Sequence, residues 1–354
     1  MSGNYAFYVH HHGSGHLMRA LAIAKRLPKG SVSFLGSNLR SYSGLIPPDI
    51  ACFQLPPDVP QPTDYAAKLR TIDFLHYAPV NVRGLAERSA MLINVLRAIS
   101  PVVLVVDVSV EVTLLATLAG FPTVVVRQNG ARNDQPHLHA YQCAQLLLAP
   151  CSENLMDTSA QNWVEEKTFF SGGFSRYSQW PVMHNGYVQD QIAVLIGSGG
   201  TSLDCSSIKQ IALQCPTYKV HVIGKPAGAI RVELPKNVIL HGLVEDPLPI
   251  LRMCEIVIGN AGHNTVMEMA DLNKRFICIT EPRPFDEQIN KGKLLAKNRM
   301  AVVIDNSEIV NSDWYALIEE VKSLPTDRWK GVIQQDALGR IAARLAGVWI
   351  DNFG

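Results

Sequence analysis

The sequence lacks the features that mark several large classes of protein. Its 354 residues carry 32 basic and 31 acidic side chains, so the overall charge does not point to a nucleic-acid partner. No apolar run approaches the roughly 20 residues that a membrane-spanning helix needs. The first residues, MSGNYAFYVHHHG, have neither the basic nor the apolar region of a signal peptide.

Cysteine is also scarce and scattered. There are seven cysteines and no CxxC pair, which favours reduced thiols over a disulfide framework or a structural zinc site. We therefore expect a cytoplasmic protein. A hydrophobic content of 47% is enough for two ordinary cores.

Apolar runs of strand length alternate with amphipathic stretches along the whole chain. YAFYV and PVVLVVDVS are typical of buried parallel strands, and HLMRALAIAKRL has the apolar spacing of a helix. A second series of alternating strand-like and helix-like segments starts at QIAVLIGSGG. We predict an α/β protein with two doubly wound, Rossmann-like domains, residues 1–175 and 188–328, joined by a linker around 172–188. Residues 329–354 are expected to form a helix that packs back towards the N-terminal domain.

Ligands of such sheets lie beyond the carboxyl ends of the strands. One loop there is GSGGTS, Gly197 to Ser202, whose backbone amides and following helix start could bind a phosphate. The alternative is an ordinary strand–helix turn. It is not a P-loop, because no Gly-Lys-Ser/Thr follows. A nicotinamide-dependent dehydrogenase is disfavoured, since GSGHLM lacks the third glycine of the dinucleotide motif and FLGSN has no acidic residue for a ribose.

A second loop, GNAGHNTVMEMA, carries more information. Asn264 and Thr265 suit a helix N-terminus that binds an anion. Glu268 follows Thr265 by three residues, which is the spacing of a capping box. The functional alternative is that the Glu268 carboxylate accepts hydrogen bonds from a ribose diol, with a diphosphate over the helix N-terminus.

GHNTVMEMA followed by PRPFDEQINKG resembles the donor-binding half of GT-B glycosyltransferases, and GSGHLMRALAIAKRL is similar to the first loop of the peptidoglycan N-acetylglucosaminyltransferase group. The resemblance implies two domains that face a cleft, with a nucleotide sugar, UDP-linked by expectation, on the second. The implied donor-binding residues are Gly197, Ser198, Gly199, Gly200, Thr201, Leu243, Val244, Asn260, Gly262, His263, Asn264, Thr265, Glu268, Glu287 and Gln288.

One position departs from many relatives. Asn260 stands where they have a phosphate-contacting histidine, so a hydrogen bond is available there but a positive charge is not. The helix dipole, the backbone amides, Ser198 or Thr201 would then carry more of the diphosphate charge. His263 is a candidate to compensate.

The resemblance also gives a role to the histidine of the first loop. An inverting transfer needs a base to take a proton from the acceptor hydroxyl, which suits a histidine at neutral pH. His16 holds the matching position, and Asp107 stands where relatives have an orienting carboxylate. Gly13, Ser14 and Gly15 would form the phosphate or acceptor loop. The structural alternatives are helix capping by His16, with a solvated ring, and by Asp107.

Other polar residues have weaker assignments. Arg127 and Asn129, after TVVV, are expected to face the acceptor. Residues 65–97 combine apolar and basic side chains, which indicates either peripheral membrane contact or an amphipathic helix packed on the sheet. His10, His11 and His12 are adjacent on an extended chain and would point in opposite directions, so we expect packing rather than chelation. With no Asp-x-Asp motif, we expect neither a metal ion nor a resident cofactor.

Three functions compete. The leading one is inverting glycosyl transfer from a nucleoside-diphosphate sugar to a hydroxyl acceptor. A hydrolase of the same fold would use the base on water, as the Gly-x-Gly-His-x-x-Arg pattern of UDP-sugar hydrolases indicates. A non-catalytic nucleotide-sugar-binding protein would keep the donor pocket without the His16–Asp107 pair.

Overall fold

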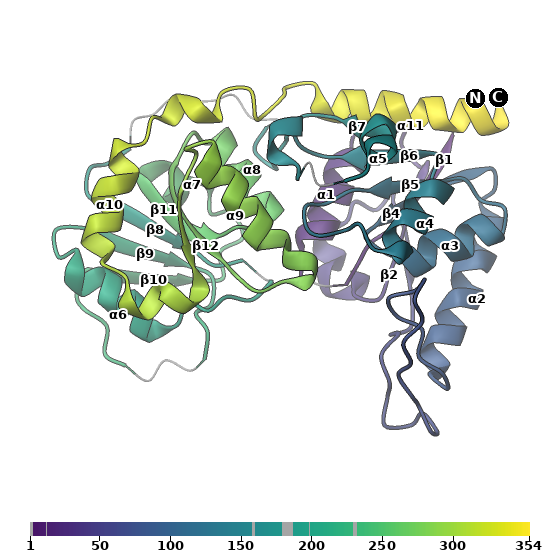
Figure 1. Cartoon of the computed structure of the whole chain (residues 1–354), viewed down its shortest axis with the longest axis horizontal. Coiled ribbons are helices and arrows are strands. Elements are labelled where there is room, and N and C mark those ends of the chain that lie inside the picture. Colours follow the sequence, from purple (N-terminus) through teal and green to yellow (C-terminus); the bar gives the residue numbers. More distant parts are fainter. Residues whose placement is uncertain (1–2, 12, 158–159, 179–186, 198, 229–231) are drawn as a thin grey trace.

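The structure is a computed structural model, and it describes residues 3–11, 13–157, 160–178, 187–197, 199–228 and 232–354. Two α/β lobes lie side by side (Figure 1). Each is built on a parallel sheet covered by helices, which confirms the predicted fold class.

In the described residues, the first sheet has the spatial order β3-β2-β1-β4-β5-β6-β7, and every pairing is parallel. Its strands are β1 (Asn4–Tyr8), β2 (Val32–Gly36), β3 (Ala51–Gln54), β4 (Val102–Asp107), β5 (Thr123–Val126), β6 (Leu146–Ala149) and β7 (Thr168–Phe170). Its helices are α1 (Gly15–Ala24), α2 (Arg83–Ala98), α3 (Val110–Leu118), α4 (Gln135–Cys143) and α5 (Asn162–Lys167). All six residues of β4 are buried, because helices cover both faces of the sheet.

The second sheet has the order β10-β9-β8-β11-β12-β13, again parallel throughout its described strands. The strands are β8 (Gln191–Leu195), β9 (Lys219–Ile223), β10 (Val238–Gly242), β11 (Ile256–Asn260), β12 (Arg275–Thr280) and β13 (Val302–Asp305). The helices are α6 (Cys205–Gln214), α7 (Leu248–Met253), α8 (His263–Asp271), α9 (Glu287–Lys297) and α10 (Trp314–Ser323).

The last helix, α11 (Ala337–Phe353), lies along the first lobe, and the segment before it crosses from the second lobe (Figure 1). Its apolar face, which includes Ile341, Leu345 and Val348, is buried in the same cluster as Phe7 of β1 and Leu17 of α1. The core of the N-terminal domain is therefore completed by the C-terminal end of the chain.

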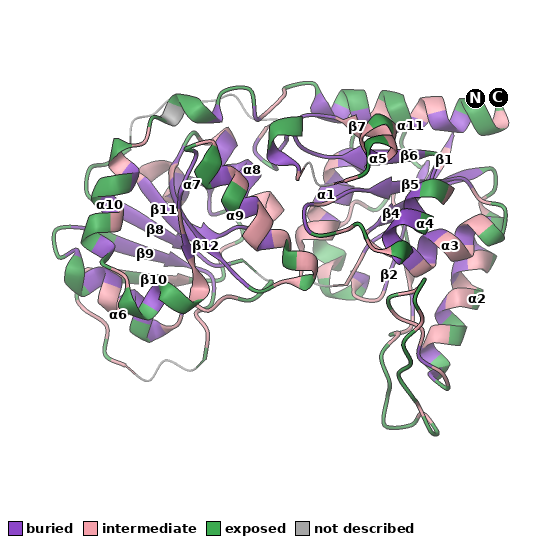
Figure 2. Cartoon of the chain, viewed as in Figure 1, coloured by how far each residue is buried: buried purple, intermediate pink, exposed green. Residues whose placement is uncertain are grey.

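Residues 65–97 divide into two parts with different surfaces. The segment before α2 protrudes from the domain and is largely exposed (Figure 2), with Tyr65, Leu69 and Phe74 among its exposed apolar side chains. Helix α2 instead buries Leu92 against the sheet, so for this helix the packing alternative holds. In the described residues, no helix is both long and apolar enough to cross a membrane.

Candidate active site

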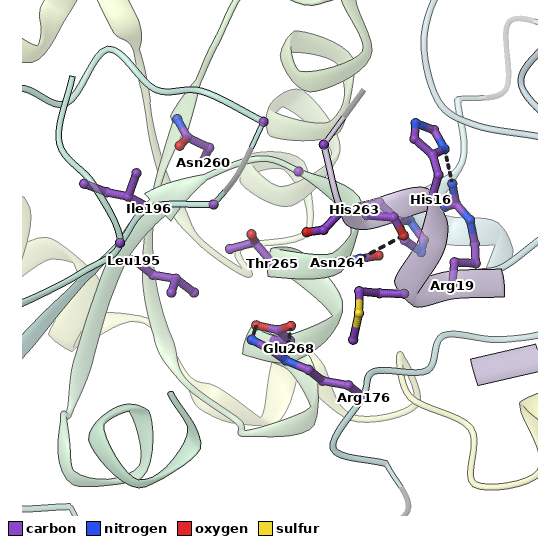
Figure 3. Close-up of a pocket in the computed structure, with 18 of the residues that line it drawn as sticks. His16, Arg19, Arg176, Leu195, Ile196, Asn260, His263, Asn264, Thr265 and Glu268 are labelled. Atoms are coloured by element: carbon purple, nitrogen blue, oxygen red, sulfur yellow. Dashed lines mark hydrogen bonds and ion pairs between the residues drawn. The ribbon is translucent and has the colours of Figure 1, made fainter. Parts of the chain in front are cut away.

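A cavity of about 380 Å³ lies where the carboxyl ends of the two sheets face each other, which is a volume typical of small-molecule sites. Figure 3 shows side chains from both domains around it. The first domain contributes Gly13, Ser14, Gly15, His16, Met18, Arg19 and Gln128, and the linker contributes Phe174, Ser175 and Arg176. The second domain contributes Gly197, Gly199, Gly200, Leu243, Val244, Asn260, Gly262, His263, Asn264, Thr265, Glu268, Arg283, Glu287 and Gln288, with Leu195, Ile196, Ile223, Gly224 and Pro247.

His16, at the start of α1, lines this cavity and is paired with a carboxylate behind it. Its Nδ1 lies 3.1 Å from Oδ2 of Asp107. Arg19 donates to both carboxylate oxygens of Asp107 at 2.9–3.1 Å. Burial opposes ionisation of Asp107, but Arg19 and His16 outweigh it and hold the pKa of this carboxyl below its ordinary value.

The capping alternatives for this pair do not hold. Ser109 caps α3 by accepting from the Val112 amide, so Asp107 is left to contact α1. The ring of His16 is held by Asp107 instead of being solvated. Gln128 adds a third contact to the carboxylate, donating to Oδ1 of Asp107 at 3.4 Å.

Helix α8 points its N-terminus into the cavity from the second domain. Its N-cap is Gly262, with no side-chain cap hydrogen bond, so the capping-box alternative for Thr265 and Glu268 does not hold. Asn264 donates to the carbonyl of Gly15 at 3.2 Å, which joins the first loop of one domain to the anion-binding end of the other. The amides of the first turn are available to an anion.

One turn further along α8, Glu268 faces the same cavity (Figure 3). It is 7% exposed and forms an ion pair of 2.9 Å with Arg176 of the linker. Burial raises the pKa of Glu268 to about 7, and Arg176 only partly offsets this effect. Burial opposes the charge of Arg176 as well, but Glu268 outweighs it and raises the pKa of Arg176. The carboxylate is therefore an acceptor whose ionisation lies near neutral pH.

The glycine-rich loop after β8 is anchored by a buried carboxylate that sequence inspection missed. Glu281 is 3% exposed and accepts from the hydroxyl of Ser202 at 2.6 Å and from Asn260 at 2.9 Å. Its backbone amide donates to Gln288 Oε1 at 3.2 Å. Thr201 also contacts Glu281, at 3.4 Å.

These contacts correct part of the predicted phosphate site. The Asn260 amide and Thr201 hydroxyl are held by Glu281, and Thr201 does not line the cavity. Helix α6 begins only at Cys205, and Asp204 caps it, so its N-terminus does not serve the loop. The expectation for Ser198 falls on a residue outside those that the structure describes.

A positive side chain does reach this loop. Arg283, partly exposed in the cavity, donates to the carbonyls of Gly199 and Gly200 at 2.8 and 2.9 Å. His263 cannot take the same role as a cation, because burial and the neighbouring Arg19 and Lys291 hold the pKa of His263 well below its ordinary value. Its neutral ring can donate a hydrogen bond but brings no positive charge.

The structure does not bring Arg127 and Asn129 to the cavity. Arg127 is buried and forms an ion pair of 2.6 Å with Glu165 of α5. Asn129 donates to the Leu155 carbonyl at 3.0 Å and accepts from the Asp157 amide at 2.9 Å. Both side chains turn into the N-terminal domain and stabilise its loops, which corrects the expectation that they face an acceptor.

The histidines after β1 also depart from the expected alternation. The strand ends at Tyr8, and the rings of His10 and His11 stack with centroids 4.7 Å apart. The ring of His10 lies 5.4 Å from that of His16. His12 lies outside the described residues.

The cavity thus combines an imidazole–carboxylate pair, a helix N-terminus, an arginine and a buried carboxylate, with an apolar wall at Leu195, Ile196, Ile223, Leu243 and Val244. Such a site can hold a nucleoside diphosphate with its base on the apolar side and its charged end towards His16. No pattern in the sequence marked Arg176 or Arg283 as site residues, because the partners of both arginines lie far from them along the chain.

Comparison with known proteins bears on this site. Residues 228–330 match the model of the glycosyltransferase family 28 C-terminal domain. The chain is a glycosyltransferase with the GT-B fold. Its matched segment contains α8, Arg283 and Gln288, which form much of the cavity wall. No curated protein sequence matches the glycosyltransferase.

Solved structures support the fold. The MurG protein of Acinetobacter baumannii is 17% identical with a TM-score of 0.62, over 97% of this chain and 99% of that one. A UDP-glucosyltransferase from Polygonum tinctorium is 14% identical with a TM-score of 0.67, over 99% of both chains. The spinosyn rhamnosyltransferase SpnG, complexed with thymidine diphosphate, is 16% identical with a TM-score of 0.60, over 97% of this chain and 96% of that one.

Proposed function

We propose that the enzyme is an inverting, metal-independent transferase that moves a sugar from a UDP-linked donor to an acceptor hydroxyl, with His16 as the general base. The observation that carries this proposal is that His16 of one domain, paired with Asp107 behind it, and the α8 N-terminus of the other domain line one cavity. His16 comes from the first domain and α8 from the second, so the proposed site is complete only where the two domains meet.

The donor is assigned to the second domain by the chemistry of its wall. The base would lie against the apolar side chains Leu243 and Val244, and the ribose hydroxyls would donate to Glu268. The diphosphate would lie over the first turn of α8 beside Arg283, where amides and a guanidinium offset its charge. A UDP-glucosyltransferase and a rhamnosyltransferase complexed with thymidine diphosphate are both similar to this chain in fold, so the preference between the two bases is tested by binding measurements.

The proposed reaction uses the tautomer of His16 that carries its proton on Nδ1, 3.1 Å from Oδ2 of Asp107, which leaves Nε2 as the proton acceptor. Nη2 of Arg19 also lies 3.3 Å from Nδ1, and in this tautomer it donates to Asp107 at 2.9 Å instead. As Nε2 takes the acceptor's hydroxyl proton, the acceptor oxygen bonds to the anomeric carbon and the bond from that carbon to the diphosphate oxygen breaks. The electron pair leaves with the diphosphate, whose charge the α8 amides and Arg283 stabilise. Attack opposite the leaving group inverts the anomeric centre.

Calorimetric titration with UDP, thymidine diphosphate, GDP and ADP tests the donor assignment. We expect UDP to bind most tightly to the wild-type protein, and Glu268→Gln to weaken that binding. His16→Ala should leave UDP binding intact while turnover of the matching UDP-sugar falls on the order of 100-fold or more.

The products separate the competing functions. Conjugated sugar in the presence of an acceptor supports transfer, whereas free sugar as the only product would indicate the hydrolase. Unchanged turnover by His16→Ala would overturn the assignment of the base. If none of the four nucleotides binds, the donor proposal fails.

A further inference from the structure

The loop before α9 contains a phenylalanine that projects from the second domain and contacts the first. Phe285 lies in the short helical turn Pro284–Asp286 after β12. Its carbonyl accepts from the Ala131 amide at 2.7 Å. Its ring meets His137 edge-on, with centroids 4.7 Å apart, and the guanidinium of Arg132 lies 4.8 Å from the ring centre.

The contact surface on the first domain, which we call the Phe285 socket, comes from three separate segments. These are the loop Gly130–Arg132, His137 of α4 and His76 of the protruding segment, whose ring lies 5.1 Å from that of Phe285. Gly130 has a φ of +116°, and a Cβ there would lie 2.5 Å from the Phe285 carbonyl oxygen. The backbones therefore approach as closely as glycine allows.

Hydrogen bonds hold the aromatic part of the socket in place. Asp134 accepts from Nδ1 of His137 at 2.9 Å and from Nε2 of His76 at 3.0 Å. Arg132 donates to Nε2 of His137 at 3.0 Å, which requires the proton of that ring to be on Nδ1. His76, Asp134 and His137 thus form a hydrogen-bonded support behind the ring of Phe285.

The backbone of the loop is strained at Phe285, which indicates that contacts with the first domain hold it in this conformation. Phe285 has a φ of +61° and Asp286 a φ of +54°. Two successive non-glycine residues in the left-handed region are unfavourable, and such conformations persist where surrounding contacts hold them. The flanking residues Arg283 and Glu287 both line the cavity, so the strained turn connects the socket to the proposed donor site.

We propose that Phe285 is a positioning residue that clasps the donor-binding domain to the acceptor-binding domain and stabilises the closed arrangement in which His16 faces the donor. The catalytic consequence rests on the proposed function. The clasp itself does not, because it is a contact between domains that can be measured without substrate.

The test measures the distance between the domains directly. Spin labels are placed at Leu118→Cys on α3 and Leu213→Cys on α6, both exposed positions, in a Cys52→Ser, Cys143→Ser background. Distance distributions by pulsed dipolar spectroscopy are then compared for the wild-type loop and for Phe285→Ala. Tyr315→Ala removes an exposed aromatic ring from the same domain and serves as its control.

A second pair of variants tests the socket from the other side. Gly130→Ala places a Cβ against the carbonyl oxygen of Phe285. Gly120→Ala is its control, because Gly120 also has a positive φ, +81°, but no atom lies within 4 Å of the new Cβ. We expect Phe285→Ala and Gly130→Ala to broaden and lengthen the distance distribution, and both controls to leave it unchanged. Thermal unfolding of each variant shows that it is folded.

Activity then reports the consequence of opening. Because the donor contacts lie mainly within the second domain, we expect Phe285→Ala to keep its UDP affinity while kcat falls on the order of tenfold to 100-fold. A distance distribution of Phe285→Ala that superimposes on that of the wild type would overturn the clasp. Failure of all nucleotides to bind the wild type would overturn the proposed function alone and leave the distance test valid.

Discussion

The contribution of Glu268 to the free energy of unfolding should fall as the pH rises, which is opposite to the effect of most carboxyl groups in proteins. The carboxyl is buried, its ion pair with Arg176 is 2.9 Å long, and burial still raises its pKa to about 7. A carboxyl whose pKa is higher in the folded than in the unfolded state binds its proton more tightly when folded. Its contribution is therefore fully present below the unfolded pKa and is lost as the pH rises through about 7.

The size of the effect follows from the gap between the ordinary pKa of 4.5 and the folded pKa of about 7. At about 1.4 kcal/mol for each tenfold change in proton affinity, it is worth about 3 kcal/mol. Glu268→Gln keeps the size of the side chain and cannot titrate. The free energy of unfolding of the wild type, relative to Glu268→Gln, should thus fall by about 3 kcal/mol between pH 4.5 and pH 8.

Urea unfolding of both proteins, monitored by tryptophan fluorescence at pH values across this range, measures the difference in their free energies of unfolding. Trp314 and Trp329 are buried in the second domain, which contains α8, and report on its unfolding. Using the difference between the two proteins removes the pH dependence of all other groups. A difference that stays flat, or that rises with pH, would refute the reasoning. In parallel, the UDP affinity of the wild type should increase as the pH rises through about 7, where Glu268 ionises.

Three further outcomes follow from the contacts described above. Asp107→Asn should lower kcat by on the order of 10³-fold or more, because it removes the acceptor that orients Nδ1 of His16; steady-state kinetics would show this, with UDP binding unchanged as the control. Glu281→Gln should raise the donor KM by loosening the glycine-rich loop, and an unaltered KM would contradict the anchoring role. Leu345→Ala, in the buried face of α11, should cost about 2–5 kcal/mol of unfolding free energy, whereas Ile350→Ala, 60% exposed on the same helix, should change it by less than about 0.5 kcal/mol.

The two sheets were predictable because their strands are buried on both faces. Such strands must be apolar throughout, as in β4, and this leaves a pattern that needs no knowledge of the partner strands. The cavity loops were predictable for a related reason. In a parallel sheet all carboxyl ends lie at one edge, so a polar loop after a strand is placed at the cleft by topology alone. His16 and Glu268 belong to segments that follow such strand ends, and the resemblance to GT-B glycosyltransferases implied their roles.

The same rule misplaced Arg127 and Asn129, since the end of a strand locates a backbone and not the direction of a side chain. Arg127 turns away because Glu165, 38 residues later, supplies its ion-pair partner. His10 and His11 were misread for a similar reason, as alternation applies only within a strand and β1 ends before them.

Local patterns of polarity were thus enough to determine the elements, the order of the domains and the edge on which the cavity lies. The ion pair of Arg176 with Glu268, the anchoring of the glycine-rich loop by Glu281 and the seating of Phe285 on the other domain were decided only by tertiary structure. Each joins residues more than 75 positions apart. Contacts of that kind depend on how the helices and loops dock in space, and no periodicity in a single sequence records them.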